Sequence, residues 1–162
     1  MRMPKITLIL APFLIALIHG CQPSLNSPES FADVDALVED AQLRITEVAP
    51  GAIDSLQNLD EYFVLLDVRS ESEHNQGYIP GSVLVPRGLL EFRIGSESFW
   101  DEEGLYLPEK EDRLVVYCKS GKRSALAADA LQKLGYTNVM SISGGFLSWK
   151  SAYPDRIEKW RA

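Results

Sequence analysis

Histidine and cysteine, two of the side chains that most often bind metals, are scarce in this sequence. It contains two of each, and His19 lies in the N-terminal segment just after an apolar run, which leaves His74 alone among Glu71 and Glu73. Because a protein metal site needs several such ligands close together, no metal is expected. His74 is instead expected to be a solvated helix position. A glycine-rich nucleotide loop is also missing, and no cofactor is expected.

Basic residues are outnumbered, because 16 lysines and arginines stand against 23 acidic residues and give a net charge of −7. Nucleic acid binding requires a basic face, so nucleic acid is not an expected partner. The length of 162 residues and the ordinary hydrophobic content of 46% predict one globular domain, and we expect a monomer.

Apolar runs of the roughly 20 residues that span a bilayer are missing as well. Residues 6–18 form a shorter apolar run of thirteen behind Arg2 and Lys5, which is typical of a signal peptide. The following segment up to Cys21 resembles the bacterial lipobox, in which cleavage precedes a cysteine that then carries lipid. This predicts a lipoprotein signal peptide at 1–20, a lipid-anchored protein of the bacterial cell envelope and a flexible tether at 21–30. The alternative is an ordinary signal peptide, or an uncleaved anchor, with an incidental cysteine.

Short apolar runs further along the chain are typical of strands that are buried on both faces of a parallel sheet. These runs cover residues 62–68, 83–85, 114–117 and 139–142. Helix-patterned segments such as 124–134 alternate with them. The alternation predicts a three-layer α/β/α fold with a central parallel sheet over residues 45–162, preceded by an accessory N-terminal helix at 31–44.

Cys118 stands at the carboxyl end of one predicted strand, where ligands bind in sheets of this kind. Five residues separate it from the helix pattern that begins at Ser124, and two lysines, a glycine and an arginine are among them. A helix N-terminus and a turn of successive amides attract an anion. The same field favours the thiolate, which is the nucleophilic form of cysteine. A buried structural cysteine is the alternative, but it would not account for the basic residues beside it.

Four segments, in this order, resemble the rhodanese family of sulfurtransferases and cover about residues 45–153. They are Leu65-Leu66-Asp67-Val68-Arg69, Gly77-Tyr78-Ile79-Pro80-Gly81-Ser82, the loop Cys118-Lys119-Ser120-Gly121-Lys122-Arg123-Ser124, and Ser143-Gly144-Gly145-Phe146 with Trp149.

The resemblance implies a rhodanese-like fold and a sulfurtransferase whose catalytic residue is Cys118. Its thiolate would take sulfane sulfur from an anionic donor such as thiosulfate and pass it, as a persulfide, to a thiol or cyanide. The residues that would bind the donor are Lys119, Ser120, Gly121, Lys122, Arg123 and Arg69. For Arg69 a structural ion pair with Asp67 is an equal alternative.

Loop length separates two reaction classes among relatives of this kind. Cysteine phosphatases have five residues between the cysteine and the arginine, whereas four lie between Cys118 and Arg123. The resemblance therefore implies sulfur chemistry, with a phosphatase or arsenate reductase as the weaker alternative. A membrane-tethered sulfur carrier with little turnover of its own is a third hypothesis. The long connection at 87–113 is expected either to wall the active site or to be a solvated excursion with Trp100 fixed in the core.

The anchoring hypothesis predicts that Cys21→Ser releases the protein from membranes or leaves it as an unprocessed precursor, because the lipid is attached to this one residue. Partitioning between detergent and aqueous phases measures the effect. Recovery of the unmutated mature chain in the aqueous phase, with a free Cys21 thiol, would show that the signal was misinterpreted.

Overall fold

The computed structural model describes residues 30–159, and residues 31–159 of these belong to one compact unit. The predicted signal peptide, Cys21 and all of the tether except Ser30 lie outside the described residues. Within residues 30–159, no helix is long and apolar enough to cross a membrane.

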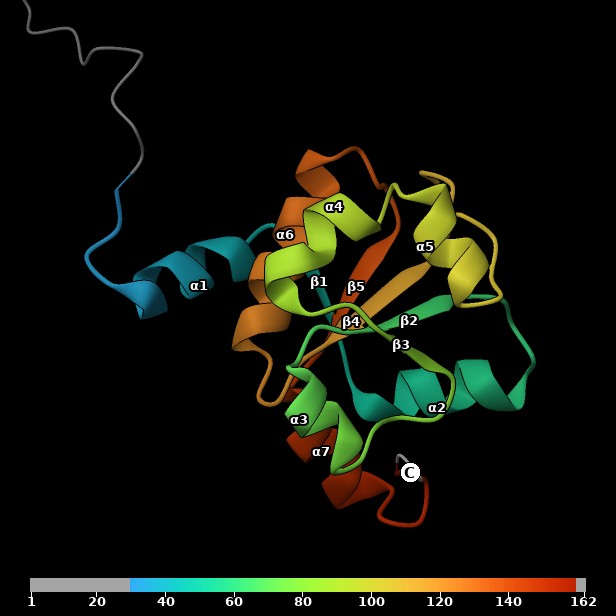
Figure 1. The fold of residues 1–162 in the computed structure, drawn as a ribbon. Helices are drawn as coiled ribbons and strands as arrows, with labels where there is room; N and C mark the ends of the chain where they lie inside the picture. Colours follow the sequence, from blue (N-terminus) through green and yellow to red (C-terminus); the bar gives the residue numbers. More distant parts are fainter. Residues whose placement is uncertain (1–29, 160–162) are drawn as a thin grey trace, which may run out of the picture. The chain divides into compact units, whose positions relative to one another are not determined.

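A five-stranded, all-parallel sheet forms the centre of this unit, in the order β1-β5-β4-β2-β3 (Figure 1). All residues of β4 and β2 are buried, as expected for neighbouring strands that are covered on both faces. The register places Asp67, at the end of β2, beside Tyr117, at the end of β4. The strands are β1 (Thr46–Val48), β2 (Val64–Asp67), β3 (Ser82–Leu84), β4 (Leu114–Tyr117) and β5 (Val139–Ile142).

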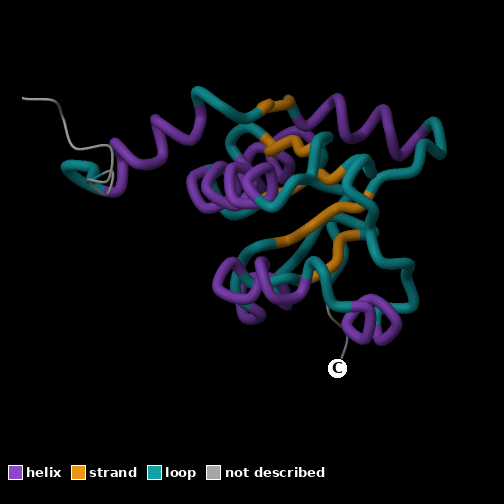
Figure 2. Tube along the Cα trace, turned by 90° about the horizontal axis from the view of Figure 1, so that it is seen from above, coloured by secondary structure: helices purple, strands orange, loops and turns teal. Residues whose placement is uncertain are grey.

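Helices cover both faces of the sheet (Figure 2). One core cluster joins the sheet to α2 and α7 through Ile53, Phe146 and Trp149, and the other joins it to α4, α5 and α6 through Leu90, Trp100 and Leu131. The three-layer α/β/α fold is therefore confirmed. The helices are α1 (Val34–Gln42), α2 (Pro50–Asn58), α3 (Glu71–Asn75), the 3-10 turn η1 (Arg87–Leu89), α4 (Leu90–Arg93), α5 (Glu97–Glu102), α6 (Lys122–Lys133) and α7 (Gly145–Ala152).

The long connection at 87–113 is not a structureless excursion, because it contains η1, α4 and α5. Trp100 is fully buried, and its indole N–H donates to the carbonyl oxygen of Ile94 at 3.1 Å. The expectation that Trp100 is fixed in the core is confirmed. The backbone N–H of Arg87 also donates to Val68 O at 3.1 Å, so the connection starts at the carboxyl edge of the sheet.

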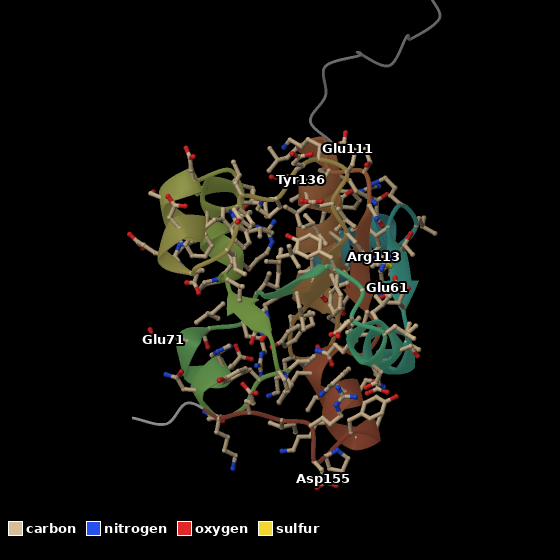
Figure 3. All side chains as sticks on the ribbon, turned by 90° about the vertical axis from the view of Figure 1, so that its right-hand side faces the viewer. Glu61, Glu71, Glu111, Arg113, Tyr136 and Asp155 are labelled. Carbon is tan, nitrogen blue, oxygen red and sulfur yellow. The ribbon has the colours of Figure 1, made fainter. Side chains whose placement is uncertain are left out.

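An ion pair links the segments that precede the two central strands, β2 and β4. Arg113 precedes β4 and Glu61 precedes β2, and the two side chains form an ion pair at 2.6 Å (Figure 3). Val64 N also donates to Arg113 O at 2.9 Å. These bonds align the start of both strands, which fixes the level at which their carboxyl ends emerge.

The accessory helix α1 packs on α6. Val38 and Ala41 are its buried residues, and Arg44, just past its end, donates to Asp129 of α6 at 2.9 Å. Helix α1 is therefore a fixed part of the unit, ahead of the first strand.

Candidate active site

Cys118 lies directly after β4, at the carboxyl edge of the sheet, and is only 1% exposed. Its Sγ accepts a hydrogen bond from the backbone N–H of Gly121 at 3.2 Å. Gly121 can direct its amide at the sulfur because its φ of 96° is left-handed, a conformation that favours glycine. It also caps α6, which therefore begins at Lys122, two residues before the start that the sequence pattern predicted.

The loop that carries Cys118 is fixed from below by the turn between β5 and α7. Phe146 N donates to Cys118 O at 2.7 Å, and Leu147 N donates to Lys119 O at 3.0 Å. This approach requires Gly145, because a Cβ there would lie 2.4 Å from Cys118 O and 2.9 Å from Gly121 N. The glycine pair of the closing segment therefore holds the loop in shape.

Arg123 is held by a carboxylate that sequence analysis did not assign to the site. Its guanidinium makes two hydrogen bonds to Glu73 of α3, at 2.8 and 2.7 Å. These bonds lower the pKa of Glu73 to about 2, and the pKa of Arg123 is raised chiefly by the same carboxylate, with Cys118 contributing. Glu73 is itself positioned by a capping box with Ser70. The spacing of Ser70 and Glu73 was a detectable signal for this cap.

The two lysines of the loop differ in their surroundings. Lys122 Nζ donates to Asp35 of α1 at 2.6 Å, with both side chains largely exposed. Lys119 is exposed, and no carboxylate pairs with it among residues 30–159. Ser120, also exposed, lies between Lys119 and Gly121. Among the predicted donor-binding residues of the loop, Gly121 and Arg123 are the ones that interact with Cys118 within residues 30–159.

Arg69 is placed differently from these loop residues. It is 3% exposed, and its guanidinium donates to both oxygens of Asp67 and to Gly77 O. Its charge also lies 4.1 Å from the ring centroid of Phe146. This arrangement favours the structural interpretation, in which Arg69 neutralises a buried carboxylate.

His74 is not the solvated helix position that the sequence predicted. It is 8% exposed, its Nδ1 lies 2.9 Å from Asp67 Oδ2, and its ring stacks on Tyr78. The prediction was wrong because the acidic neighbours of His74 in sequence point elsewhere, as Glu71 does at the edge of α3 (Figure 3).

Asp67 accepts hydrogen bonds from three side chains in the buried region behind the loop. Besides Arg69 and His74, the Tyr117 hydroxyl donates to Asp67 Oδ2 at 2.9 Å. Burial on its own would raise the pKa of Asp67, but the hydrogen bonds from His74 and Arg69 lower it below the usual value. Burial raises the pKa of Tyr117, which therefore stays a neutral donor.

Comparisons with known proteins agree with this architecture. A mitochondrial protein of Schizosaccharomyces pombe is 42% identical over 92 residues, which are 56% of this chain and 65% of that one. The human thiosulfate:glutathione sulfurtransferase is 35% identical over 91 residues, covering 52% of this chain and 76% of its own. A solved structure from Rhodopseudomonas palustris, of unknown function and titled a possible tyrosine phosphatase, is 30% identical with a TM-score of 0.64, covering 78% of this chain and 96% of that one.

The family model described as Rhodanese-like domain matches residues 52–152, which is more than half of the chain. The chain therefore belongs to the rhodanese-like domain family. The matched segment begins within α2, so α1 and β1 lie outside it.

The tight contact at the glycine pair predicts that Gly145→Ala lowers the free energy of unfolding by about 3 kcal/mol or more, because the methyl group adds a clash to backbone strain. Gly135→Ala is the matched control: its φ of 91° is also left-handed, but a Cβ there meets nothing within 4 Å. We expect the control to lose about 1 kcal/mol in urea unfolding. Equal losses in the two variants would show that the loop does not need this close approach.

The lowered pKa of Glu73 predicts a pH-dependent contribution to stability. A carboxylate whose pKa falls from its usual 4.5 to about 2 on folding stabilises the fold fully above pH 4.5 and progressively less as the pH falls towards 2. Glu73→Gln should therefore lower the free energy of unfolding by about 1 kcal/mol at pH 7, a value reduced by solvent screening. The difference from wild type should shrink below pH 4.5 in denaturation experiments.

Glu71→Gln, on the same helix, serves as the control for Glu73→Gln, since no hydrogen bond to the Glu71 side chain is found among residues 30–159. A constant difference between wild type and Glu73→Gln from pH 7 to pH 2 would contradict the pairing.

Proposed function

We propose that this protein is a sulfurtransferase that moves sulfane sulfur from an anionic donor, such as thiosulfate, to a thiol or cyanide acceptor through a Cys118 persulfide. The observation that carries the proposal is the hydrogen bond from Gly121 N to Cys118 Sγ at 3.2 Å, at the N-terminus of α6. An amide directed at this sulfur stabilises the negative charge of the thiolate, which is the attacking form.

The proposed reaction has two steps, each an attack on sulfur. The Cys118 thiolate attacks the outer sulfur of thiosulfate, the sulfur–sulfur bond of the donor breaks, and its electron pair leaves with sulfite. An acceptor thiolate or cyanide then attacks the terminal sulfur of the persulfide and regenerates the Cys118 thiolate. Covalent storage of the sulfur between two substrates gives ping-pong kinetics.

The loop residues have separate roles in this proposal. The backbone N–H of Gly121, at the head of α6, faces the reacting sulfur, while Lys119 and Arg123 supply positive charge for the anionic donor. Glu73 holds Arg123 by two hydrogen bonds, at 2.8 and 2.7 Å, which sets the direction of its guanidinium. Arg69 is left out of donor binding, because it is 3% exposed and its Nε and Nη2 groups already donate to Asp67 and Gly77.

A phosphatase is the second candidate, because one structural neighbour is titled a possible tyrosine phosphatase. The four residues between Cys118 and Arg123 make a loop one residue shorter than cysteine phosphatases have, and this favours sulfur over phosphate. A sulfur carrier with little turnover uses the same persulfide and differs in rate alone. Lipid anchoring through Cys21 is part of the proposal, and the sequence of residues 1–21 is its support.

Replacement of the nucleophile tests the proposal. Cys118→Ser should abolish thiocyanate formation from thiosulfate and cyanide, because an alcohol cannot form the persulfide, while the near-isosteric side chain preserves the fold. Circular dichroism and thermal unfolding serve as the fold control, and mass spectrometry after thiosulfate treatment should find one added sulfur atom in wild type alone.

More than a trace of activity in Cys118→Ser would exclude Cys118 as the nucleophile. If the wild-type protein gains the sulfur atom but forms almost no thiocyanate, the result would favour the sulfur-carrier hypothesis over the sulfurtransferase. Hydrolysis of p-nitrophenyl phosphate at a faster rate than sulfur transfer would establish the phosphatase.

A further inference from the structure

Helix α1 lies outside the segment that matches the family, yet its first turn contacts the catalytic loop. Asp35 Oδ1 accepts a hydrogen bond from Lys122 Nζ at 2.6 Å. Hydrogen bonding by Asp35, with smaller attractions from Asp33 and Glu39, raises the pKa of Lys122. The pair is exposed, with side chains 61% and 62% accessible, so it adds little to stability. The negative charge of Asp35, however, lies beside the loop.

The ion pair borders a groove that runs along the outer side of the loop. The groove has a volume of about 320 Å³ and separates the catalytic loop from α1 and β1. The loop side contributes Ser120, Gly121 and Lys122, with Ser143 and Gly144 beneath, while the opposite side carries Asp35, Glu39 and Glu47. An anion that approaches the loop along this side therefore meets carboxylates.

Carboxylates that pair with the cations of the loop reduce the attraction of the loop for an anion. Three cations stand in the loop, and two of them are paired, Lys122 with Asp35 and Arg123 with Glu73. Three positive charges less two negative charges leave the loop and its paired carboxylates with a net charge of +1. Glu73 belongs to the matched segment, whereas Asp35 does not. Asp35 thus changes the charge of the loop from a helix that lies outside the matched segment.

We propose that Asp35 is a specificity-determining residue, which weakens the attraction of the catalytic loop for doubly charged sulfur donors and favours singly charged ones, such as thiosulfonates and hydropersulfide anions. The inference rests on the proposed sulfurtransferase function and names the charge class of its donor. The reason is that Coulomb energy is proportional to ligand charge, so one carboxylate opposes a dianion twice as strongly as a monoanion.

Two donors that differ in charge but undergo the same reaction separate this effect from others. Thiosulfate carries two negative charges and releases sulfite, whereas methanethiosulfonate carries one and releases methanesulfinate. In both, the Cys118 thiolate bonds to the outer sulfur, the bond between that sulfur and the oxidised sulfur breaks, and the electron pair leaves with the oxidised fragment. No other reactant is needed to form the persulfide.

The test compares kcat/KM of wild type and Asp35→Asn for both donors, with cyanide as acceptor and at low ionic strength. We expect an increase of about twofold for methanethiosulfonate and about fourfold for thiosulfate, since the factor for the dianion is the square of that for the monoanion. Both increases should vanish in about 1 M salt, where charges are screened within about 3 Å. Asp40→Asn is the matched control, because Asp40 lies on the same helix but pairs with Arg44.

Equal factors for the two donors, or no change for either, in an active protein would overturn this inference and leave the proposed function standing. A wild type that transfers sulfur from neither donor would overturn the proposed function and the donor class with it. Alkylation of Cys118, followed on its own peptide by mass spectrometry, gives a readout that needs no turnover. Asp35→Asn should raise the rate ratio of iodoacetate to iodoacetamide about twofold, and an unchanged ratio would refute the effect of Asp35 on the charge at the loop.

Discussion

The buried carboxylate of Asp67 is the interaction on which the arrangement of the site depends. It ends β2 and accepts hydrogen bonds from Arg69, from His74 and from Tyr117, the residue before Cys118. A buried carboxylate needs this many donors, since an unpaired charge in the interior is strongly unfavourable. The three partners therefore keep fixed positions, and β2, α3 and β4 are held together at one edge of the sheet.

Asp67 also affects the position of the Cys118 loop, through its contact with α3. His74 ties this short helix to Asp67, and the preceding residue, Glu73, holds Arg123 at the start of α6. The direction of the arginine therefore depends on a helix of five residues that the buried carboxylate anchors. On the other side, the close approach of Gly145 fixes the loop backbone. The loop is thus determined by residues far from it in sequence.

Local patterns predicted the frame of the fold well. The runs at 114–117 and 139–142 are strands with these bounds, and Cys118 lies where the strand order and the motif placed it. A strand that is buried on both faces of a parallel sheet has a continuous apolar sequence, so the run itself reveals the strand. The acidic neighbours of His74 in sequence led to the wrong prediction of an exposed side chain, because its burial depends on a contact outside α3. Its partner, Asp67, is the last residue of β2, seven positions earlier, and no periodicity within α3 reveals that contact.

The same distinction applies to the charge of the loop. Its sequence shows three cations, but their carboxylate partners, Asp35 and Glu73, come from α1 and α3 and were not predictable from spacing within the loop. The motif contains Cys118 and the Gly121 amide that donates to it, and both lie within six consecutive residues. The field that an approaching anion meets depends on side chains 87 and 50 positions away along the chain. Two proteins with the same loop sequence can therefore differ in the donors they prefer, because the selection by charge lies in the elements that surround the loop.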